Sequence, residues 1–281
     1  MQLGVHGLNT KATLDPAVTV QLARRAEELG YSSWWAGDHV VLPSPRTPPS
    51  PMAPTDPVLD PLTHLAYVAA VTERLELGTG ILILPQRNPL VLAKQAASVD
   101  VLSGGRLLLG VAAGFLEAEM TAVGVPFKER GQRTDEYIDA MTALWTQQQP
   151  AFEGRYASFR DVDAHPRPVR PGGPRIMVGG HSPAALRRAV ARGHGWIGNG
   201  DSPETLAGHL AALKQAMAEV DRPARLGPLE ITFAHLDPAT LDAETVRRYA
   251  ALGLDRLLLY PVPLENPADI LAFLEERAPT A

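Results

Sequence analysis

The polar residues best placed to do chemistry stand at the ends of apolar runs. Asp38 and His39 end one run, and His6 ends an earlier one. An adjacent carboxylate and imidazole can bind a polar ligand, orient one another, or move a proton near neutral pH. We therefore expect Asp38 and His39 to belong to a functional site. His6 either lines a pocket or is a core histidine whose hydrogen bonds are satisfied.

A glycine-rich turn offers a second kind of chemistry. It lies within the string VGGHSP at 178–183. Glycine lets the backbone approach an anion closely, and a helix that opens at Ser182 presents free N–H groups and the positive end of its dipole. Two glycines before a capped helix are also an ordinary connection. The turn is a candidate phosphate site, but the string alone does not decide between these two interpretations.

The sequence does not favour a metal centre. His6, Asp38 and His39 lack the tight His-x-His pair expected of a metal-dependent barrel hydrolase, and His181 and His235 come without a convincing set of carboxylates. The chain contains no cysteine, which excludes disulfides, thiolate metal sites and cysteine nucleophiles.

Eight apolar runs, most of them separated by helical periods, must position these residues. Eight strands that alternate with helices in 281 residues suit a single α/β domain over 1–281, a (β/α)8 TIM barrel, because such barrels typically occupy about 250 residues. A doubly wound sheet is the alternative. The runs cover 2–7, 33–38, 75–82, 106–114, 175–180, 195–200, 229–236 and 256–262.

Helix boundaries are marked by capping residues. A polar residue followed by proline is a start signal, and it occurs at 15–16, 182–183, 202–203 and 237–238. A further helical period opens at Pro89 and stops at Ser103, before two glycines. Helices are therefore expected to begin at each of these pairs.

Two stretches interrupt the alternation of strands and helices. The proline-rich segment 43–61 excludes helix or central strand and follows the second strand, so it is either a disordered surface loop or a wall over a substrate. The segment 147–174 is an excursion that contains a short hairpin near 152–156. We assign no chemistry to this second stretch.

Composition restricts the partners and the location. The chain is 45% hydrophobic and 20% charged, and none of its apolar runs approaches the length needed to cross a membrane. A net charge of −5 argues against a general nucleic-acid-binding role. We expect a cytoplasmic protein that acts on a small-molecule substrate, with neither nucleic acid nor membrane as a partner.

The ordered series of motifs resembles the luciferase-like monooxygenase superfamily, in particular the branch that uses the deazaflavin coenzyme F420. The resemblance covers nearly the whole chain, and its LSGGR-x-x-LG string is specific to the superfamily. The motifs are WAGDH at 35–39, LGTGI at 77–81, LSGGR at 102–106 with LG at 109–110, GVPF at 124–127 with RG at 130–131, and GGHS at 179–182.

This resemblance implies a cofactor site. The family carries a non-proline cis peptide in the third strand, a bulge behind the deazaflavin ring, and Gly80-Ile81 occupies that position. Asp38 and His39 match a pair beside the ring, where the histidine can exchange a proton. The turn carrying Gly179, Gly180 and Ser182 matches the phosphate site. The residues Thr79, Gly114 and His181 complete the expected cofactor contacts.

One departure bears on the substrate. The family's sugar-phosphate dehydrogenases place a catalytic glutamate after the glycine at Gly114, whereas this chain has Phe115. Phe115 and His6 are therefore expected to line a more apolar substrate pocket. Glu117 and Glu119 lie close by, but carboxylates at a helix start are more often solvated partners of the dipole.

The resemblance implies an F420-dependent oxidoreductase that transfers a hydride between the deazaflavin and a small organic substrate, as a reductase of an activated double bond. His39 would handle the proton. The alternatives are an FMN-dependent monooxygenase or reductase and a flavin-binding protein without turnover. Relatives commonly form dimers, and the apolar residues that could supply such an interface are Leu62, Leu65, Ala66, Ala69, Ala70, Val123, Val125 and Phe127.

Overall fold

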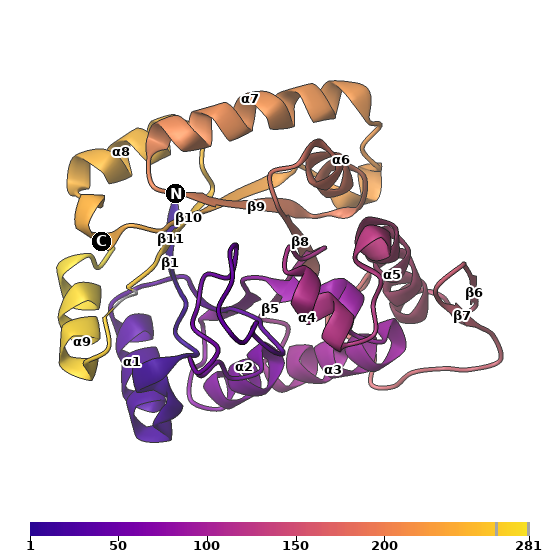
Figure 1. Ribbon diagram of the computed structural model, residues 1–281, viewed down its shortest axis with the longest axis horizontal. Helices are drawn as coiled ribbons and strands as arrows, with labels where there is room; N and C mark the ends of the chain where they lie inside the picture. The colour runs from indigo at the N-terminus through magenta and orange to yellow at the C-terminus, as the bar shows by residue number, and fades with distance from the viewer. Residues whose placement is uncertain (262–263, 280–281) are drawn as a thin grey trace.

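A closed barrel of parallel strands forms the centre of the protein in a computed structural model that describes residues 1–261 and 264–279 (Figure 1). The strand order is β3-β2-β1-β11-β10-β9-β8-β5-β4, and the additional pairing of β3 with β5 closes the barrel. The strands are β1 (Gln2–His6), β2 (Ser33–Ala36), β3 (Glu76–Thr79), β4 (Leu82–Ile83), β5 (Leu107–Ala112), β8 (Arg175–Gly179), β9 (Gly195–Gly200), β10 (Glu230–His235) and β11 (Arg256–Leu259).

The third barrel strand is interrupted, since β3 and β4 are its two halves on either side of 80–81. Each half pairs in parallel with β5. All eight predicted runs therefore contain barrel strands, and the (β/α)8 prediction is confirmed over the doubly wound alternative. Val262, the end of the last predicted run, lies outside the described residues.

Helices surround the barrel in the ribbon view, with α7 and α8 along one edge and α1, α2 and α3 along the opposite edge (Figure 1). The helices are α1 (Pro16–Glu28), α2 (Pro61–Ala69), α3 (Pro89–Leu102), α4 (Glu117–Ala122), α5 (Arg130–Thr146), α6 (Pro183–Arg192), α7 (Pro203–Glu219), α8 (Ala243–Ala251) and α9 (Pro267–Glu276). No helix among the described residues has the length and apolar character that crossing a membrane requires.

Most of the predicted helix starts are confirmed. The side chains of Asp15, Ser182 and Ser202 each accept a backbone N–H at the first turn of the helix that follows. The pair at 237–238 is a correction, because it opens only the 3-10 turn Pro238–Thr240. Helix α8 begins five residues later than expected from that pair, where Asp242 supplies the cap.

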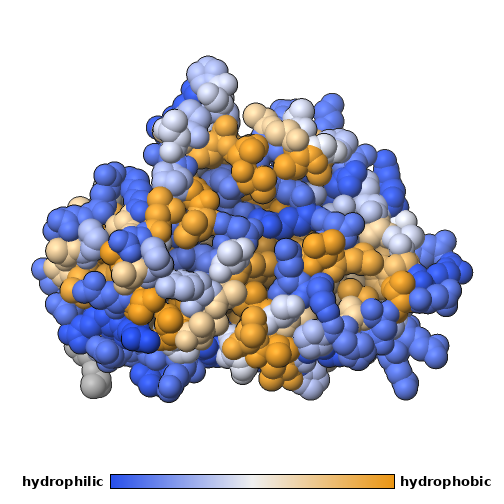
Figure 2. Space-filling model, turned by 90° about the horizontal axis from the view of Figure 1, so that it is seen from below, coloured by the Kyte–Doolittle hydropathy of each residue, from blue (hydrophilic) through white to orange (hydrophobic). Residues whose placement is uncertain are grey.

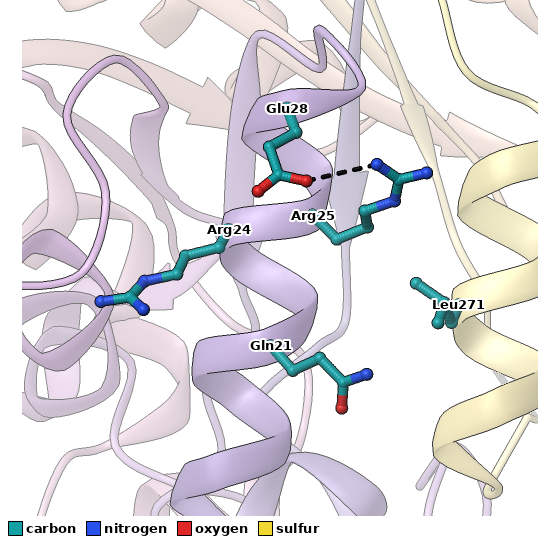
Figure 3. Close-up of a pocket in the computed structure, with 5 residues that line it drawn as sticks. All are labelled: Gln21, Arg24, Arg25, Glu28 and Leu271. Atoms are coloured by element: carbon teal, nitrogen blue, oxygen red, sulfur yellow. Dashed lines mark hydrogen bonds and ion pairs between the residues drawn. The ribbon is translucent and has the colours of Figure 1, made fainter.

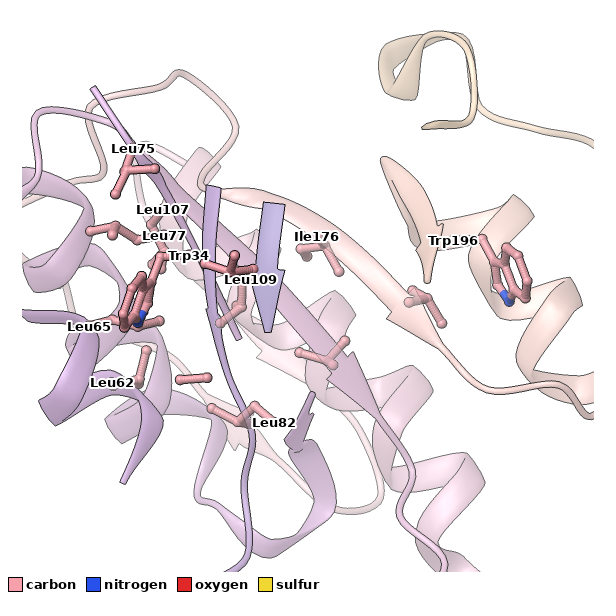
Figure 4. Close-up of a cluster of buried hydrophobic side chains, with 14 of the residues drawn as sticks. Trp34, Leu62, Leu65, Leu75, Leu77, Leu82, Leu107, Leu109, Ile176 and Trp196 are labelled. Carbon is pink, nitrogen blue, oxygen red and sulfur yellow. The ribbon is translucent and has the colours of Figure 1, made fainter. Parts of the chain in front are cut away.

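Two apolar clusters hold the barrel and its helices together. Inside the barrel, Trp35 packs with inward-facing residues of other strands, including Leu108, Met177 and Leu258. Arg256 adjoins this layer, with its guanidinium carbon 5.7 Å from the Trp35 ring centroid and Nη2 2.6 Å from Glu76 Oε2. Outside the barrel, a larger cluster fills the space between strands and helices, and Figure 4 shows Trp34 of β2 in it beside side chains of α2.

The two interruptions have different structures. The segment from 43 to 60 contains neither helix nor strand, as predicted, and Pro61 begins α2. Its end is fixed rather than free, because Asn9 Nδ2 donates to Leu59 O at 2.8 Å and Leu59 N–H donates to Asn9 O at 3.0 Å. The excursion at 147–174 contains the predicted hairpin, formed by β6 (Phe152–Glu153) and β7 (Ser158–Phe159).

The apolar residues expected at a dimer interface are mostly used within the barrel domain. Leu62, Leu65 and Ala69 are buried in the large cluster, and Val125 packs with Ile83 in a smaller one. Their helical spacing therefore reflects packing on the barrel. Other apolar side chains remain exposed on the helices, and Figure 2 shows them in patches on the face seen from below Figure 1. Exposed members of α2 and α3 are Tyr67, Val91, Val101 and Leu102.

The close packing of β5 against the interrupted strand gives a test of the fold. A Cβ on Gly110 would lie 1.9 Å from the backbone oxygen of Thr79, whereas a Cβ on Gly208 in α7 would meet no atom within 4 Å. We expect Gly110→Ala to lower the free energy of unfolding by about 1–3 kcal/mol through overpacking. Gly208→Ala should raise it by about 0.5–1 kcal/mol, since alanine favours helix. Urea unfolding measures both, and equal midpoints for Gly110→Ala and the wild type would contradict this packing.

Candidate active site

Three of the residues singled out in the sequence, His6, Asp38 and Gly179, contact the segment around the break in the third barrel strand. The peptide bond between Gly80 and Ile81 is cis, which confirms the expectation drawn from the resemblance. Gly80 N–H donates to Ala36 O at 2.7 Å, so the break is bonded to the end of β2. Because the barrel is parallel, the carboxyl ends of all its strands surround this point.

His6 packs directly against the break. Its Nε2 hydrogen-bonds to Gly80 O, and because a carbonyl oxygen only accepts, Nε2 carries the proton in the neutral ring. A Cβ on Gly80 would lie 2.5 Å from this ring, which explains glycine at that position. Burial lowers the pKa of His6 below its ordinary value, and the backbone bond opposes that shift. Its Nδ1 is buried without a hydrogen-bond partner among the described residues.

The glycine-rich turn adjoins the break on another side. A Cβ on Gly179 would lie 2.0 Å from Ile81 Cδ1, so no larger residue fits there without movement. Gly180 has φ +115°, a conformation that favours glycine. Ser182 then caps α6, with its Oγ accepting from Ala185 N–H at 3.2 Å. The glycine-rich turn predicted to bind phosphate therefore lies next to the break at Gly80 and Ile81.

His181 is oriented toward α7. Its ring stacks on that of His209, with centroids 4.1 Å apart and planes 9° from parallel. Asn199 N–H donates to His181 Nε2 at 3.2 Å, which places the ring proton of the neutral form on Nδ1. Burial lowers the pKa of His181 below its ordinary value, and the neighbouring His209 adds to this effect. The partner His209 was not anticipated from the sequence.

Asp38 and His39 do not orient one another, which corrects one of the roles considered for the pair. Asp38 Oδ2 accepts from Ile83 N–H at 2.9 Å, and its Oδ1 accepts from Arg87 Nη2 at 2.7 Å. Burial raises the pKa of Asp38, while the Arg87 cation opposes that shift. Arg87 Nη1 also donates to Asp60 at 3.0 Å, so Asp38 belongs to a structural ion-pair chain beside the bulge.

His39 instead contacts Glu119. The His39 Nδ1 lies 3.1 Å from Glu119 Oε2, and Val40 N–H donates to Glu119 Oε1 at 2.7 Å. Glu119 is 1% exposed, so the expectation of a solvated helix-start carboxylate was wrong for it. Glu117, two residues earlier, is exposed as expected.

The remaining predicted positions differ in their access to a ligand. Thr79 is buried and donates its hydroxyl to Gly110 O at 2.6 Å, so this side chain supports the break from behind. Gly114 has φ +78°, and its carbonyl accepts from Arg130 Nε at 3.2 Å. Phe115 is 50% exposed and lies edge-on to the His39 ring at a centroid distance of 6.3 Å. Phe115 is thus available to contact a ligand beside His39.

Sequence reasoning missed Arg87, the buried role of Glu119, and Asn9. The buried Asn9 side chain accepts from Gly37 N–H at 3.0 Å and donates to Gly37 O at 2.9 Å, which fixes the end of β2. One signal for Glu119 was available, because it shares a helical face with the buried residues Leu116 and Met120. No comparable pattern marked Arg87 or Asn9.

We also considered a surface hollow and possible metal-binding groups elsewhere in the protein. A surface hollow lies between α1 and α9, and Figure 3 shows Arg25 and Glu28 paired at its edge while Arg24 points away from α9. Its lining contains only residues of these outer helices. Within 1–261 and 264–279, His, Cys, Asp and Glu side chains form no group of three or more that could hold a metal ion.

The arrangement fits a flat ring compound with a phosphate-bearing tail. Glycines border the break where a Cβ would collide with Ile81 or His6, so these two side chains pack directly on the backbone there. His39 and the half-exposed Phe115 lie side by side, and Gly180 and Ser182 precede a capped helix whose first N–H groups favour an anion. A flavin or deazaflavin combines these two chemical features.

Comparison with known proteins agrees with this geometry. The family model described as luciferase-like monooxygenase matches residues 2–273. An uncharacterised protein of Mycobacterium tuberculosis is 34% identical over 262 residues, covering 90% of this chain and 88% of that protein. An F420-dependent glucose-6-phosphate dehydrogenase of Kineococcus radiotolerans is 34% identical over 255 residues, covering 85% and 70% of the two chains.

Solved structures share the fold at lower identity. An F420-dependent secondary alcohol dehydrogenase, solved with an F420-acetone adduct, superposes with a TM-score of 0.76 at 16% identity and covers 98% of this chain and 97% of its own. The oxygenating constituent of 3,6-diketocamphane monooxygenase from Pseudomonas putida, solved with FMN, has a TM-score of 0.76 at 16% identity, with 99% and 97% covered. The match of the family model over almost the full length, together with the 34% identical relatives, shows that this chain belongs to the luciferase-like monooxygenase family.

Proposed function

We propose that this chain is an F420-dependent oxidoreductase that transfers a hydride between the deazaflavin and a small organic substrate, acting as a reductase of an activated C=C, C=N or C=O bond. The observation that carries the proposal is the close packing around Gly80 and Ile81, where the Gly179–Gly180 turn lies against the Ile81 side chain. The 34% identical relative from Kineococcus radiotolerans is named as F420-dependent, which supports F420 as a candidate cofactor. A 32% identical relative from Pseudomonas putida, matched over 56% of this chain, is named as FMNH2-dependent, so FMN stays the alternative.

Each part of the site has a distinct task in this reaction. When bound, the deazaflavin supplies the carbon that gives or accepts the hydride. The Gly80-Ile81 break would support the ring, and the turn of Gly179, Gly180 and Ser182 would hold the phosphate. His39 exchanges the proton that balances hydride transfer, because its imidazole is the titratable group beside Phe115.

Phe115 narrows the substrate class. A half-exposed phenyl ring at this position cannot exchange a proton and offers no partner for a sugar hydroxyl. We therefore propose a substrate less polar than the glucose 6-phosphate of the Kineococcus radiotolerans relative. An apolar ring beside His39 also helps to exclude water from the reacting atoms, which favours transfer to carbon.

Cofactor choice is tested by parallel titration. We expect F420 to quench tryptophan fluorescence at lower concentration than FMN does. Tight binding of FMN with no response to F420 would assign the chain to the FMN-dependent monooxygenases or reductases of the family. Binding of either compound without turnover of any activated alkene, imine or ketone in a substrate panel would favour a flavin-binding protein without catalysis.

The role of His39 is tested by substitution. His39→Ala should lower kcat by about 10²- to 10⁴-fold, the usual contribution of general acid–base catalysis, with a smaller change in cofactor affinity. His165→Ala, which removes an exposed histidine of the excursion at 147–174, is the matched control and should leave both quantities unchanged. Loss of affinity with normal kcat at saturating cofactor would make His39 a binding residue only.

We also propose a homodimer, as relatives of this fold commonly form. A two-fold interface buries the same patch on both subunits, and the exposed apolar residues of α2 and α3 could supply one. Light scattering after size exclusion, over a series of dilutions, should give twice the 30.2 kDa mass of the chain. Leu102→Glu should shift the mass toward the monomer if α3 contributes. A monomeric mass for the wild type at micromolar concentration would refute the dimer.

A further inference from the structure

The carboxylate of Glu119 is unusual because it is buried beside the histidine that the proposed function uses. It is 1% exposed on the short helix α4, in the third residue of that helix. A buried carboxylate is costly unless each oxygen accepts hydrogen bonds. Both oxygens of Glu119 are bonded, one to a backbone N–H and the other to an imidazole nitrogen.

The chemistry of these two bonds fixes where the His39 proton lies. Val40 N–H can only donate, so Glu119 Oε1 accepts from it at 2.7 Å. The second oxygen, Oε2, lies 3.1 Å from His39 Nδ1. A carboxylate only accepts, and therefore Nδ1 must carry a hydrogen. The neutral ring is held in the Nδ1–H form.

We propose that Glu119 is a positioning residue that fixes the tautomer and orientation of His39, so that Nε2 is the nitrogen that exchanges protons with the substrate. This inference rests on the proposed function for its catalytic meaning. Its structural part, the Nδ1–H tautomer, is independent of the cofactor. Within the described part of the chain, no residue hydrogen-bonds to His39 Nε2.

The proton balance follows from this arrangement. When a substrate atom takes up a proton, the Nε2–H bond of the doubly protonated ring breaks, and the ring becomes neutral with Nδ1–H still bonded to Glu119. The reverse reaction places the proton on the Nε2 lone pair. Glu119 keeps its two hydrogen bonds in both states, so the ring does not need to turn between them.

A merely structural role for Glu119 is the competing interpretation. In that case the carboxylate would only tie the segment 39–40 to α4, and either tautomer of His39 would serve. The two interpretations differ in what a glutamine does at this position. The Gln amide oxygen must still accept from Val40 N–H, which leaves its NH₂ group facing His39 Nδ1. Two facing donors repel, so Glu119→Gln should convert the neutral ring to the Nε2–H tautomer.

The experiment is long-range ¹H–¹⁵N NMR of histidine-labelled protein without added cofactor, at alkaline pH. The His39 signal is assigned among the eight histidines as the one lost in His39→Ala. We expect Nδ1–H in the wild type and Nε2–H in Glu119→Gln. The matched control is Glu117→Gln, an identical change at an exposed position of the same helix, and it should retain Nδ1–H.

Kinetics supply the second readout. Glu119→Gln should lower kcat by about 10²-fold or more at little change in KM. In this variant the neutral ring has no lone pair on Nε2, and the doubly protonated ring would place Nδ1–H against the Gln NH₂ group. Glu117→Gln should leave kcat unchanged. An Nε2–H tautomer in the wild type overturns the inference, and this measurement does not depend on whether a Glu119 variant folds. An unchanged tautomer in folded Glu119→Gln overturns it as well. If the tautomers behave as expected but F420 does not bind, the proposed function fails and the Glu119–His39 assignment stands.

Discussion

The site depends on one steric constraint, the close approach of backbone segments around Gly80 and Ile81. His6 hydrogen-bonds to Gly80 O, Gly110 lies against the Thr79 carbonyl, and Gly179 lies against the Ile81 side chain. A Cβ at any of these glycines would fall within 2.5 Å of an existing atom. Because glycines stand at this level in three separate segments, the neighbouring backbone and side chains pack closely where the strand ends meet.

Ionic contacts then fix the loops that leave this surface. Asp38 binds Arg87 and the Ile83 N–H, and Arg87 also binds Asp60, the cap of α2. Arg87 therefore bonds both to Asp38, next to the break, and to Asp60, at the end of the proline-rich segment between β2 and α2. Such a partly buried chain of charges is sensitive to removal of one member, since the remaining carboxylates would lose their compensating cation.

Local patterns in the sequence were sufficient to predict the barrel, most helix starts and the glycine positions. A cap at Ser182 is determined by its own backbone and immediate neighbours, so its meaning can be inferred from a short string. The prediction at 237–238 failed because the same signal also starts a 3-10 turn. The bonds of Asp38 to Arg87 and of His39 to Glu119 join residues 49 and 80 positions apart, and only the folded barrel brings them together.

Asp38 and His39 are adjacent in the sequence, but their side chains make different contacts. Asp38 faces the barrel backbone and Arg87. Its two oxygens accept hydrogen bonds from Ile83 N–H and Arg87, which stabilise the backbone next to the break. His39 faces α4, where its Nδ1 hydrogen-bonds to Glu119, and its ring also lies edge-on to Phe115. Phe115 cannot exchange a proton, whereas the imidazole of His39 is hydrogen-bonded to the buried carboxylate of Glu119. A half-exposed apolar ring and an imidazole held by a buried carboxylate therefore lie next to each other at this end of the barrel.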